Sequence, residues 1–544
     1  MSDVAPSTKK GSAFWLCFLA IILANLLSAL DLTALSTAVP KIVEELNGGD
    51  NFVWIGSAYG LAATAILPFS GRLADVFGRR PVALLAIAIF VLGSALGGAA
   101  QSMNWLIAAR TVQGIGGGAI VNLGSIVLSD LVPLAERGTY QSILVLVWAL
   151  ASGVGPLVIG ALADGSGWRW VFYLNIPIAS VSFACVAVFL NVKTPPGSVR
   201  EKLGRVDWIG NFIVIAGTTL ALIALTWAGV RFPWNSPHVL APLVIGMALI
   251  VTFFTYEATI PAEPTVPLDL LSHRTALSGY ISTFFVGITL ISALYYLPVY
   301  FQACLGVSPF RSSVDQLSAN LFSPLFSIIA GIVIKKTGRY LPINVFGWTV
   351  QIIGFSLLTL LKADSPTGLW VPLQMIAGAG VGSIWAGNVF PILAAVPVPR
   401  MAAALAFQNF VRSFGQTWGI TICATILQNE LKRRLPAGFL AQFPAGVEVA
   451  YAAIPLIPRL EEPLRTEVRV AFAESLAVVW KVIAGVAACG FVTLAILREV
   501  PMHTVTDDRF ALQERRGAGG DSEAAVVGGE TKEASMDSGS EKPL

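Results

Sequence analysis

Long apolar runs alternate with short polar connections along most of the chain. A helix that crosses a bilayer needs about 20 mostly apolar residues. Measured against that length, the pattern predicts about fourteen membrane-spanning helices. Their expected ranges are 14–36, 52–70, 82–100, 105–128, 139–162, 170–191, 208–229, 239–257, 276–300, 315–334, 342–361, 370–394, 402–427 and 475–497. The chain is therefore predicted to be an all-α integral membrane protein in a lipid bilayer.

The composition agrees with a membrane protein and narrows the functional classes. Of the 544 residues, 55% are hydrophobic and only 12% are charged, which is too apolar for a water-soluble globule. The net charge of +3 comes from basic residues scattered over short loops, so no nucleic-acid partner is expected. The sequence has no Gly-x-x-x-x-Gly-Lys-Ser/Thr phosphate loop, and its five cysteines have no paired spacing. No cofactor, disulfide framework or metal site is therefore expected. A membrane-embedded enzyme is also disfavoured, because His238, His273 and His503 lie at helix ends, in loops or in the tail.

The Lys and Arg residues of the short loops indicate the orientation, since they concentrate on the cytoplasmic side. With a cytoplasmic N-terminus, the inside segments hold fifteen of them and the short outside loops hold five. Both termini are therefore expected in the cytoplasm, with residues 1–12 as the N-terminal segment and 499–544 as a disordered tail. The apolar run after residue 12 is expected to be a retained first helix and not a cleaved signal peptide. A long external loop is expected at 430–473, with amphipathic stretches such as 463–473 forming short helices on the outer face.

A charged, glycine-containing segment at 71–80 separates two apolar runs, and it has four charged residues within nine positions. We predict that it is a loop with roles in topology and gating. A similar segment follows 260 positions later, where Gly331, Lys335, Gly338 and Arg339 match Gly71, Asp75, Gly78 and Arg79. Two related halves, with a substrate site between them, are typical of secondary transporters. A chance match between two basic loops is the alternative.

Matching the halves divides the chain into regions. The first half is expected at 13–192 and the second at 275–498, each as a six-helix bundle. The linker at 193–274 then holds two extra membrane-spanning helices.

Five segments of the membrane region match the motifs of one family. They are Leu30–Pro40, Gly71–Arg80, Arg110–Gly117, Gly153–Gly160 and Trp168–Pro177. Together they resemble the major facilitator superfamily, specifically the fourteen-helix drug:proton antiporter branch common among fungal multidrug and toxin exporters. Two departures are visible, because Ile159 stands where the fifth-helix motif has a second glycine and Lys335 replaces the aspartate of the repeated segment.

The resemblance implies a monomeric, proton-coupled exporter of small amphipathic organic molecules that works by alternating access. The proton gradient supplies the energy, and the plasma membrane is preferred to the vacuolar membrane. A vacuolar transporter of basic amino acids, a siderophore transporter and a non-transporting membrane sensor of the same fold are the alternatives.

Asp31 and Arg110 are the candidates for proton coupling. Each lies about six residues from the outer end of its predicted helix, so the two side chains are expected at similar depth. Ionisable groups inside a membrane span are costly and usually functional. A carboxyl group exchanges a proton when burial raises its pKa and a neighbouring Arg lowers it, so a conformational change switches it between the two states. The alternatives are that Asp31 faces the outer water and that Arg110 pairs with a backbone carbonyl.

Gating is expected to depend on Gly71, Asp75, Gly78, Arg79 and Arg80. As the resemblance implies, Asp75 faces the positive N-terminus of the helix that begins near Ala402 and so closes the inner side. The arginines also anchor the orientation.

The fifth-helix segment offers Gly153, Gly155, Pro156 and Gly160, which permit close packing and a bend. The resemblance implies that this motif biases the protein toward export, and a generic packing kink is the alternative.

The remaining candidates form a possible substrate cavity: Gln113, Tyr295, Trp385, Asn409, Arg412 and Gln416. The last three share one helix face, with Arg412 near mid-bilayer and without an obvious acidic partner in the second half. Aromatic residues suit bulky organic molecules, although they also serve packing and lipid contact. With few acidic residues besides Asp31, neutral or mixed drug-like substrates are expected.

Overall fold

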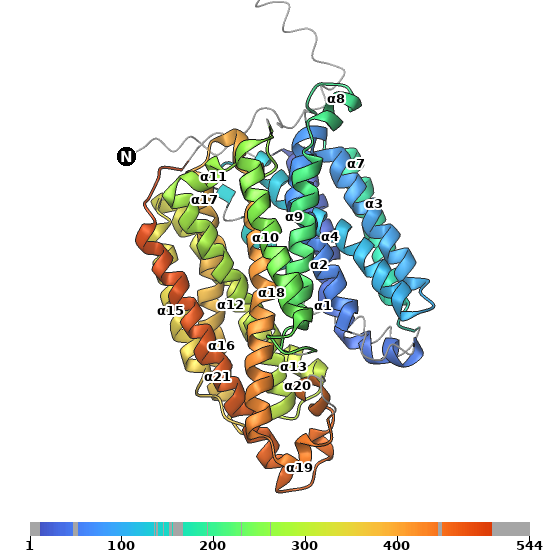
Figure 1. Cartoon of the computed structure of the whole chain (residues 1–544). Coiled ribbons are helices and arrows are strands. Elements are labelled where there is room, and N and C mark those ends of the chain that lie inside the picture. The colour runs from blue at the N-terminus through green and yellow to red at the C-terminus, as the bar shows by residue number, and fades with distance from the viewer. Residues whose placement is uncertain are drawn as a thin grey trace, which may run out of the picture.

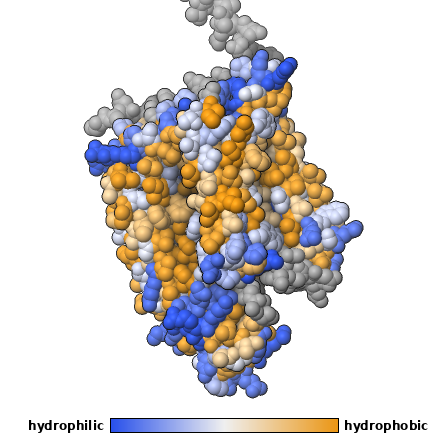
Figure 2. Space-filling view, in the orientation of Figure 1, coloured by the Kyte–Doolittle hydropathy of each residue, from blue (hydrophilic) through white to orange (hydrophobic). Residues whose placement is uncertain are grey.

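The computed structural model describes residues 11–46, 53–134, 136–137, 140–144, 146–148, 150–151, 155, 167–192, 194–229, 231–261, 263–443 and 449–502. These residues form helices and connecting turns, and an isolated β-bridge joins Ala228 and Phe232. Eleven stretches within them are long and apolar enough to cross a membrane. Hydrophobic side chains cover the middle of the visible face and hydrophilic ones gather at its ends (Figure 2). The prediction of an all-α membrane protein is therefore confirmed.

The described part of the first half contains four long helices and a broken one. They are α1 (Ser12–Glu45), α2 (Val53–Phe77), α3 (Arg79–Gly98), α4 (Met103–Leu131), and α6 (Trp170–Tyr173) followed by α7 (Asn175–Phe189). The predicted helix at 139–162 lies largely outside the described residues.

The linker contains α8 (Val199–Gly204), α9 (Trp208–Trp227), α10 (Pro237–Thr259) and α11 (Asp269–Ser272). Helices α9 and α10 pack against each other, and α9 also contacts α2 and α18, so the linker pair lies against the bundle (Figure 1). Large apolar side chains on the linker pair remain exposed, among them Ile209, Phe212 and Val251. These side chains suit contact with lipid tails.

The second half is built from six long helices and several short ones. They are α12 (Arg274–Cys304), α13 (Pro309–Asp315), α14 (Leu317–Thr337), α15 (Leu341–Leu358), α16 (Thr367–Gly387), α17 (Val389–Ala394), α18 (Met401–Arg434), α19 (Ala437–Leu440), α20 (Val449–Ala453) and α21 (Leu464–Val492). Helices α2 and α18, of 25 and 34 residues, are not among the eleven apolar stretches, so the count of fourteen is not reproduced in full.

The expected loop at 430–473 is shorter in the structure. Helix α18 continues to Arg434 and α21 begins at Leu464. Residues 464–473 therefore start a long helix rather than forming a separate surface helix, and that expectation is wrong. An amphipathic stretch is compatible with a surface helix and also with the end of a long membrane helix. A membrane helix that extends beyond the apolar layer has polar residues at its end. The expected tail at 499–544 lies outside the described residues from 503 onward.

The same helix packing occurs in both halves. Two glycines of α4 lie against the backbone of α2, and two glycines of α16 lie against the backbone of α14. The pairs are Gly114 with Tyr59, Gly118 with Ala63, Gly378 with Ala319, and Gly382 with Ser323. Between halves the glycines are 264 positions apart and their partners are 260 positions apart. Small residues allow such close helix contacts in membranes. The shared spacing agrees with the prediction of two related halves.

Candidate functional site

A buried ion pair joins α1 to α4. Arg110 Nη1 lies 2.5 Å from Asp31 Oδ2, and both side chains are 1% exposed. Arg110 Nε also donates to the carbonyl oxygen of Ile55 in α2 at 3.0 Å. The structure therefore brings the two candidates for proton coupling into direct contact, inside the first half and away from water.

The ion pair has further neutral partners. Gln113 Nε2 donates to Asp31 Oδ1 at 2.8 Å, and Asn175 Nδ2, at the start of α7, donates to the same oxygen at 3.0 Å. Gln113 Oε1 in turn accepts from Arg110 at 2.6 Å, while the ring of Tyr59 lies 4.5 Å from the guanidinium carbon. Gln113, which the sequence analysis predicts as a cavity residue, thus belongs to this buried cluster. Arg110, Gln113 and Asn175 together donate to both oxygens of the Asp31 carboxyl group.

The segment Gly71–Arg80 is not a loop. Helix α2 continues through Phe77, α3 begins at Arg79, and only Gly78 lies between them. Gly78 has a φ of 95°, which glycine adopts without the steric penalty of a side chain. One residue therefore makes the whole turn, and the prediction of a loop is corrected.

Arg79 connects the end of α2 to the end of α4. Its Nη1 lies 2.6 Å from Asp75 Oδ1 and its Nε lies 2.8 Å from Asp130 Oδ2. Arg79 is 1% exposed and Asp130 is 6% exposed. Within the described residues Asp75 makes no hydrogen bond or ion pair with α18, and its expected interaction with the first turn of that helix stays a prediction. The sequence analysis did not identify Asp130 as a candidate, because nothing in the sequence around it indicates that it pairs with Arg79.

Arg80 binds the opposite side of the first half. Its Nη1 donates to Asn191 Oδ1 at 3.0 Å, and its Nη2 donates to the carbonyl oxygen of Ala187. Arg80 thus fastens the start of α3 to the end of α7.

Contacts between the two halves gather at one end of the bundle, which we call the Gly78 end. Asn409 Nδ2 in α18 donates to Asn122 Oδ1 in α4 at 3.0 Å. Lys335 Nζ, at the end of α14, lies 3.0 Å from Glu136 Oε1 in the first half. Lys335 replaces an acidic residue in the repeated segment and so gains an ion pair across the halves. These contacts hold the halves together at the Gly78 end.

Gly71 lets α2 approach α18 closely at this end. A Cβ atom at Gly71 would lie 2.5 Å from the Cβ of Ala406, closer than side-chain atoms normally approach. We expect Gly71→Ala to disfavour the closed Gly78 end by about 1–3 kcal/mol, as overpacking does in other interiors. In a transporter that works by alternating access, as the resemblance implies, this closure is one step of the cycle, so we expect slower transport, measured as initial rates in membrane vesicles.

Gly60 supplies the control for that substitution. It lies on the same helix, and a Cβ atom there would meet nothing within 4 Å. If Gly60→Ala and Gly71→Ala slow transport equally, the contact with Ala406 is not the cause.

The fifth-helix motif is mostly outside the described residues. Gly153, Pro156 and Gly160 lie there, while Gly155 is helical and buried. Its expected role stays a prediction.

Of the cavity candidates, Arg412 and Trp385 contact each other. The guanidinium carbon of Arg412 lies 4.4 Å from the centre of the Trp385 ring, and Nη2 donates to Asn409 Oδ1 at 2.5 Å. Tyr295 is 40% exposed, and Gln416 is half-buried on the same helix as Arg412. The structure thus joins three of the candidates into one cluster between α16 and α18.

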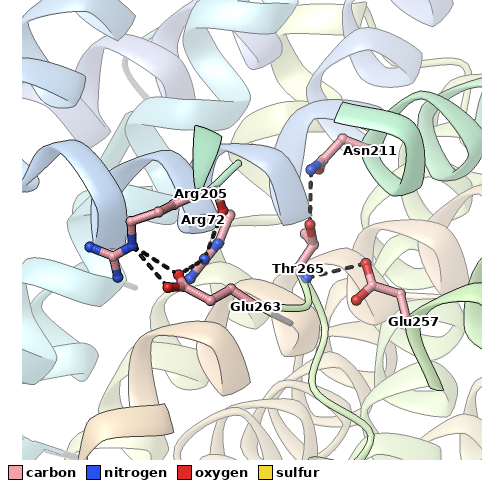
Figure 3. Close-up of polar contacts among 6 residues, drawn as sticks. All are labelled: Arg72, Arg205, Asn211, Glu257, Glu263 and Thr265. Carbon is pink, nitrogen blue, oxygen red and sulfur yellow. Dashed lines mark hydrogen bonds and ion pairs between the residues drawn. The ribbon is translucent and has the colours of Figure 1, made fainter. Parts of the chain in front are cut away.

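The linker helices are fastened to α2 by Glu263, which follows α10. Glu263 accepts from Arg72 of α2 and from Arg205 Nε, which lies 2.9 Å from Oε1 (Figure 3). Although burial opposes it, the hydrogen bonds from Arg205 and Arg72 lower the pKa of Glu263. The ion pairs thus connect the charged segment at 71–80 to the linker, a contact that the sequence analysis did not predict.

A second group of contacts lies beside Glu263. Asn211 Nδ2 donates to Thr265 Oγ1 at 2.8 Å, and the Thr265 N–H donates to Glu257 Oε1 at 3.2 Å (Figure 3). The chain after α10 is therefore held against both linker helices.

We expect Glu263→Gln to lower the free energy of unfolding at neutral pH by about 0.2–1 kcal/mol, because Glu263 is 40% exposed and water screens its ion pairs. A lowered pKa means that the stabilisation is present above the unfolded-state pKa, about 4.3, and is lost as the pH falls through the folded-state value. The difference from wild type should therefore shrink in acid, as measured by thermal melting of the purified protein at pH 7 and below pH 4. Glu467→Gln, at an exposed site in the first turn of α21, is the control. Equal losses at both sites would contradict the assignment.

A helical bundle of two related halves, with a linker helix pair and a buried Asp–Arg pair, has the architecture of a secondary membrane transporter. The chain belongs to the major facilitator superfamily, because the model of that family matches residues 21–420. It is therefore a multi-pass membrane transporter with a small-molecule substrate and is not an enzyme.

Related proteins cover almost the whole chain. "Efflux pump FUS6" of Gibberella fujikuroi is 38% identical over 524 residues, 95% of this chain and 94% of that protein. "MFS-type efflux pump LUC4" of a Fusarium species is 36% identical over 515 residues, 93% of this chain and 91% of that protein. The human organic anion transporter MFSD10 (TETRAN) has a similar structure, with a TM-score of 0.57, 14% identity, and coverage of 89% of this chain and 100% of that chain. The last likeness concerns the fold alone.

Proposed function

We propose that this protein is a proton-coupled exporter of small amphipathic organic molecules. The observation that carries the proposal is the ion pair of Asp31 and Arg110, which is buried inside the first half. Two relatives that span nearly the whole chain are named efflux pumps, which supports export over import.

The ion pair suggests how a proton is exchanged. While Arg110 and the two amides contact Asp31, the carboxylate is favoured and the proton leaves. If the halves rock and Arg110 moves away, Asp31 remains buried without its positive partner, and protonation becomes favourable. The same rocking opens the Gly78 end by breaking contacts such as Asn122–Asn409. Proton uptake and access of substrate are then coupled through one motion of the halves.

The proposal extends to the setting of the transporter. Its Gly78 end and both termini face the cytoplasm, as the distribution of Lys and Arg favours. It acts as a monomer in the plasma membrane, where an exporter lowers the cytoplasmic concentration of its substrate.

Inside-out membrane vesicles with an acidic interior test the function. We expect vesicles that contain the full chain to accumulate at least one of two fluorescent amphipaths, cationic rhodamine 6G or anionic dansyl-leucine, and to release it when a protonophore removes the gradient. Vesicles from the same host without the protein are the control. Accumulation that is independent of the gradient would exclude proton coupling, and no accumulation of either compound above control would count against an exporter of this class.

A further inference from the structure

Arg412 is a positive charge within the membrane region, and it has no carboxylate partner in the described part of the chain. It lies roughly 16 Å along α18 from Met401, at 1.5 Å per residue. Its protein partners are one amide oxygen, Asn409 Oδ1, and one ring face, Trp385. Arg79 and Arg110, by contrast, each contact carboxylates. A charge at membrane depth is costly unless it is paired, so Arg412 requires another explanation.

The partners of Arg412 fix its position and leave donors free. Asn409 donates its amide N–H to Asn122 across the halves, which directs its oxygen toward Arg412. Trp385 covers one face of the guanidinium at 4.4 Å. A guanidinium has five N–H donors in a planar fork, and Asn409 accepts from only one nitrogen. The remaining donors have no protein acceptor among the described residues.

We infer that Arg412 is the receptor for an acidic group of the substrate, so the transported molecules are amphipathic organic anions such as carboxylic acids. This inference rests on the proposed function and names its substrate class. A carboxylate matches the fork of an arginine with two parallel hydrogen bonds. Trp385 supplies an apolar surface beside the charge, which suits the organic part of the same molecule.

The location supports a role in transport as well as in binding. Asn409 contacts Arg412 on one side and Asn122 of the first half on the other. An anion bound to Arg412 is therefore linked through Asn409 to the Asn409–Asn122 contact, which must break when the Gly78 end opens.

Three probes with one fluorophore test the inference on the purified full-length protein. Dansyl-leucine is an anion, its methyl ester is neutral, and dansylcadaverine is a cation. Binding is followed by the rise in dansyl emission on transfer to an apolar site, without any proton gradient. We expect wild type to bind the acid at least about tenfold more tightly than the ester or the cation, because only the acid pairs with Arg412.

The variants then locate the effect. We expect Arg412→Gln to bind dansyl-leucine about tenfold to one hundredfold more weakly, with little change for the ester, and Arg412→Lys to lie between it and wild type. Arg433→Gln, at an exposed arginine near the end of the same helix, should match wild type. Thermal melting confirms that each variant is folded. If Arg412→Gln does not fold, the inference is still tested by two measurements: the relative affinities of wild type for the three probes, and the affinity of Arg412→Lys for dansyl-leucine.

Two outcomes overturn the inference: a folded Arg412→Gln that binds the acid as wild type does, or a wild type that prefers the ester or the cation. Neither outcome contradicts the proposed proton-coupled export if vesicles accumulate rhodamine 6G in a gradient-dependent manner. Conversely, a preference for the acid that depends on Arg412, with transport insensitive to the gradient, would uphold the anion site and reject proton coupling.

Discussion

Asp31→Asn should abolish accumulation driven by a proton gradient and leave substrate exchange intact. The amide is close to the carboxyl group in shape, and it neither binds nor releases a proton. Arg110 keeps its hydrogen bonds to the carbonyl oxygen of Ile55 and to Gln113, which hold it in place, although the loss of its carboxylate partner lowers the free energy of unfolding because Arg110 stays buried. Gradient-driven accumulation in inside-out vesicles should fall to the level of vesicles without the protein. Exchange of labelled for unlabelled substrate at equal pH should continue, because it requires binding and rocking but no net proton movement.

Asp364→Asn is the matched control for this prediction, since Asp364 is exposed and lies outside the buried cluster. It should accumulate substrate as wild type does. If Asp31→Asn still concentrates substrate against its gradient, the proton is carried elsewhere. If both accumulation and exchange fail in a protein that is still folded and unfolds cooperatively, Asp31 has a role in binding or in the rocking motion.

The hydropathy pattern predicted the fold because membrane depth sets helix length, and that signal is local. The duplicated spacing of Gly71 and Gly331 predicted two halves, and the matching glycine contacts of α4 and α16 agree with that prediction. The hydropathy pattern was a poor guide to helix ends. Gly78 alone makes a turn for which a loop was predicted, and the polar start of α21 was predicted to be a separate surface helix.

Charged residues were easier to find than their partners. Asp31 and Arg110 stood out because charge inside an apolar run is rare, and their pairing followed from equal depth. Glu263 lies beyond the spans, where acidic residues are ordinary, and only the fold brings it to Arg72. Asp130 had the same disadvantage at the end of α4. Such partners depend on which helix ends meet, a property that spacing along one chain does not contain.

The ion pairs of Arg79 carry the largest stability prediction. Arg79→Gln removes the positive charge between Asp75 and Asp130 and leaves Asp130, which is 6% exposed, as a buried carboxylate without its ion-pair partner and with only Arg137 as a positive neighbour. Breaking a buried pair in this way costs about 3–5 kcal/mol. We expect a loss of that size in the free energy of unfolding, measured by denaturant titration of the purified protein in detergent.

The neighbouring arginine and a second substitution separate charge pairing from general damage. Arg80 donates to neutral oxygens of Asn191 and Ala187, so Arg80→Gln should cost only about 1 kcal/mol, as loss of ordinary hydrogen bonds does. Adding Asp130→Asn to Arg79→Gln removes the unpaired charge and should recover much of the lost stability, a non-additivity expected of groups in contact. If the two substitutions instead add, or if Arg79→Gln costs no more than Arg80→Gln, the carboxylates do not depend on Arg79. Recovery by the double substitution would mean that Arg79 stabilises the Gly78 end by neutralising Asp130, so movements of α2 relative to α4 must keep this pair or replace it.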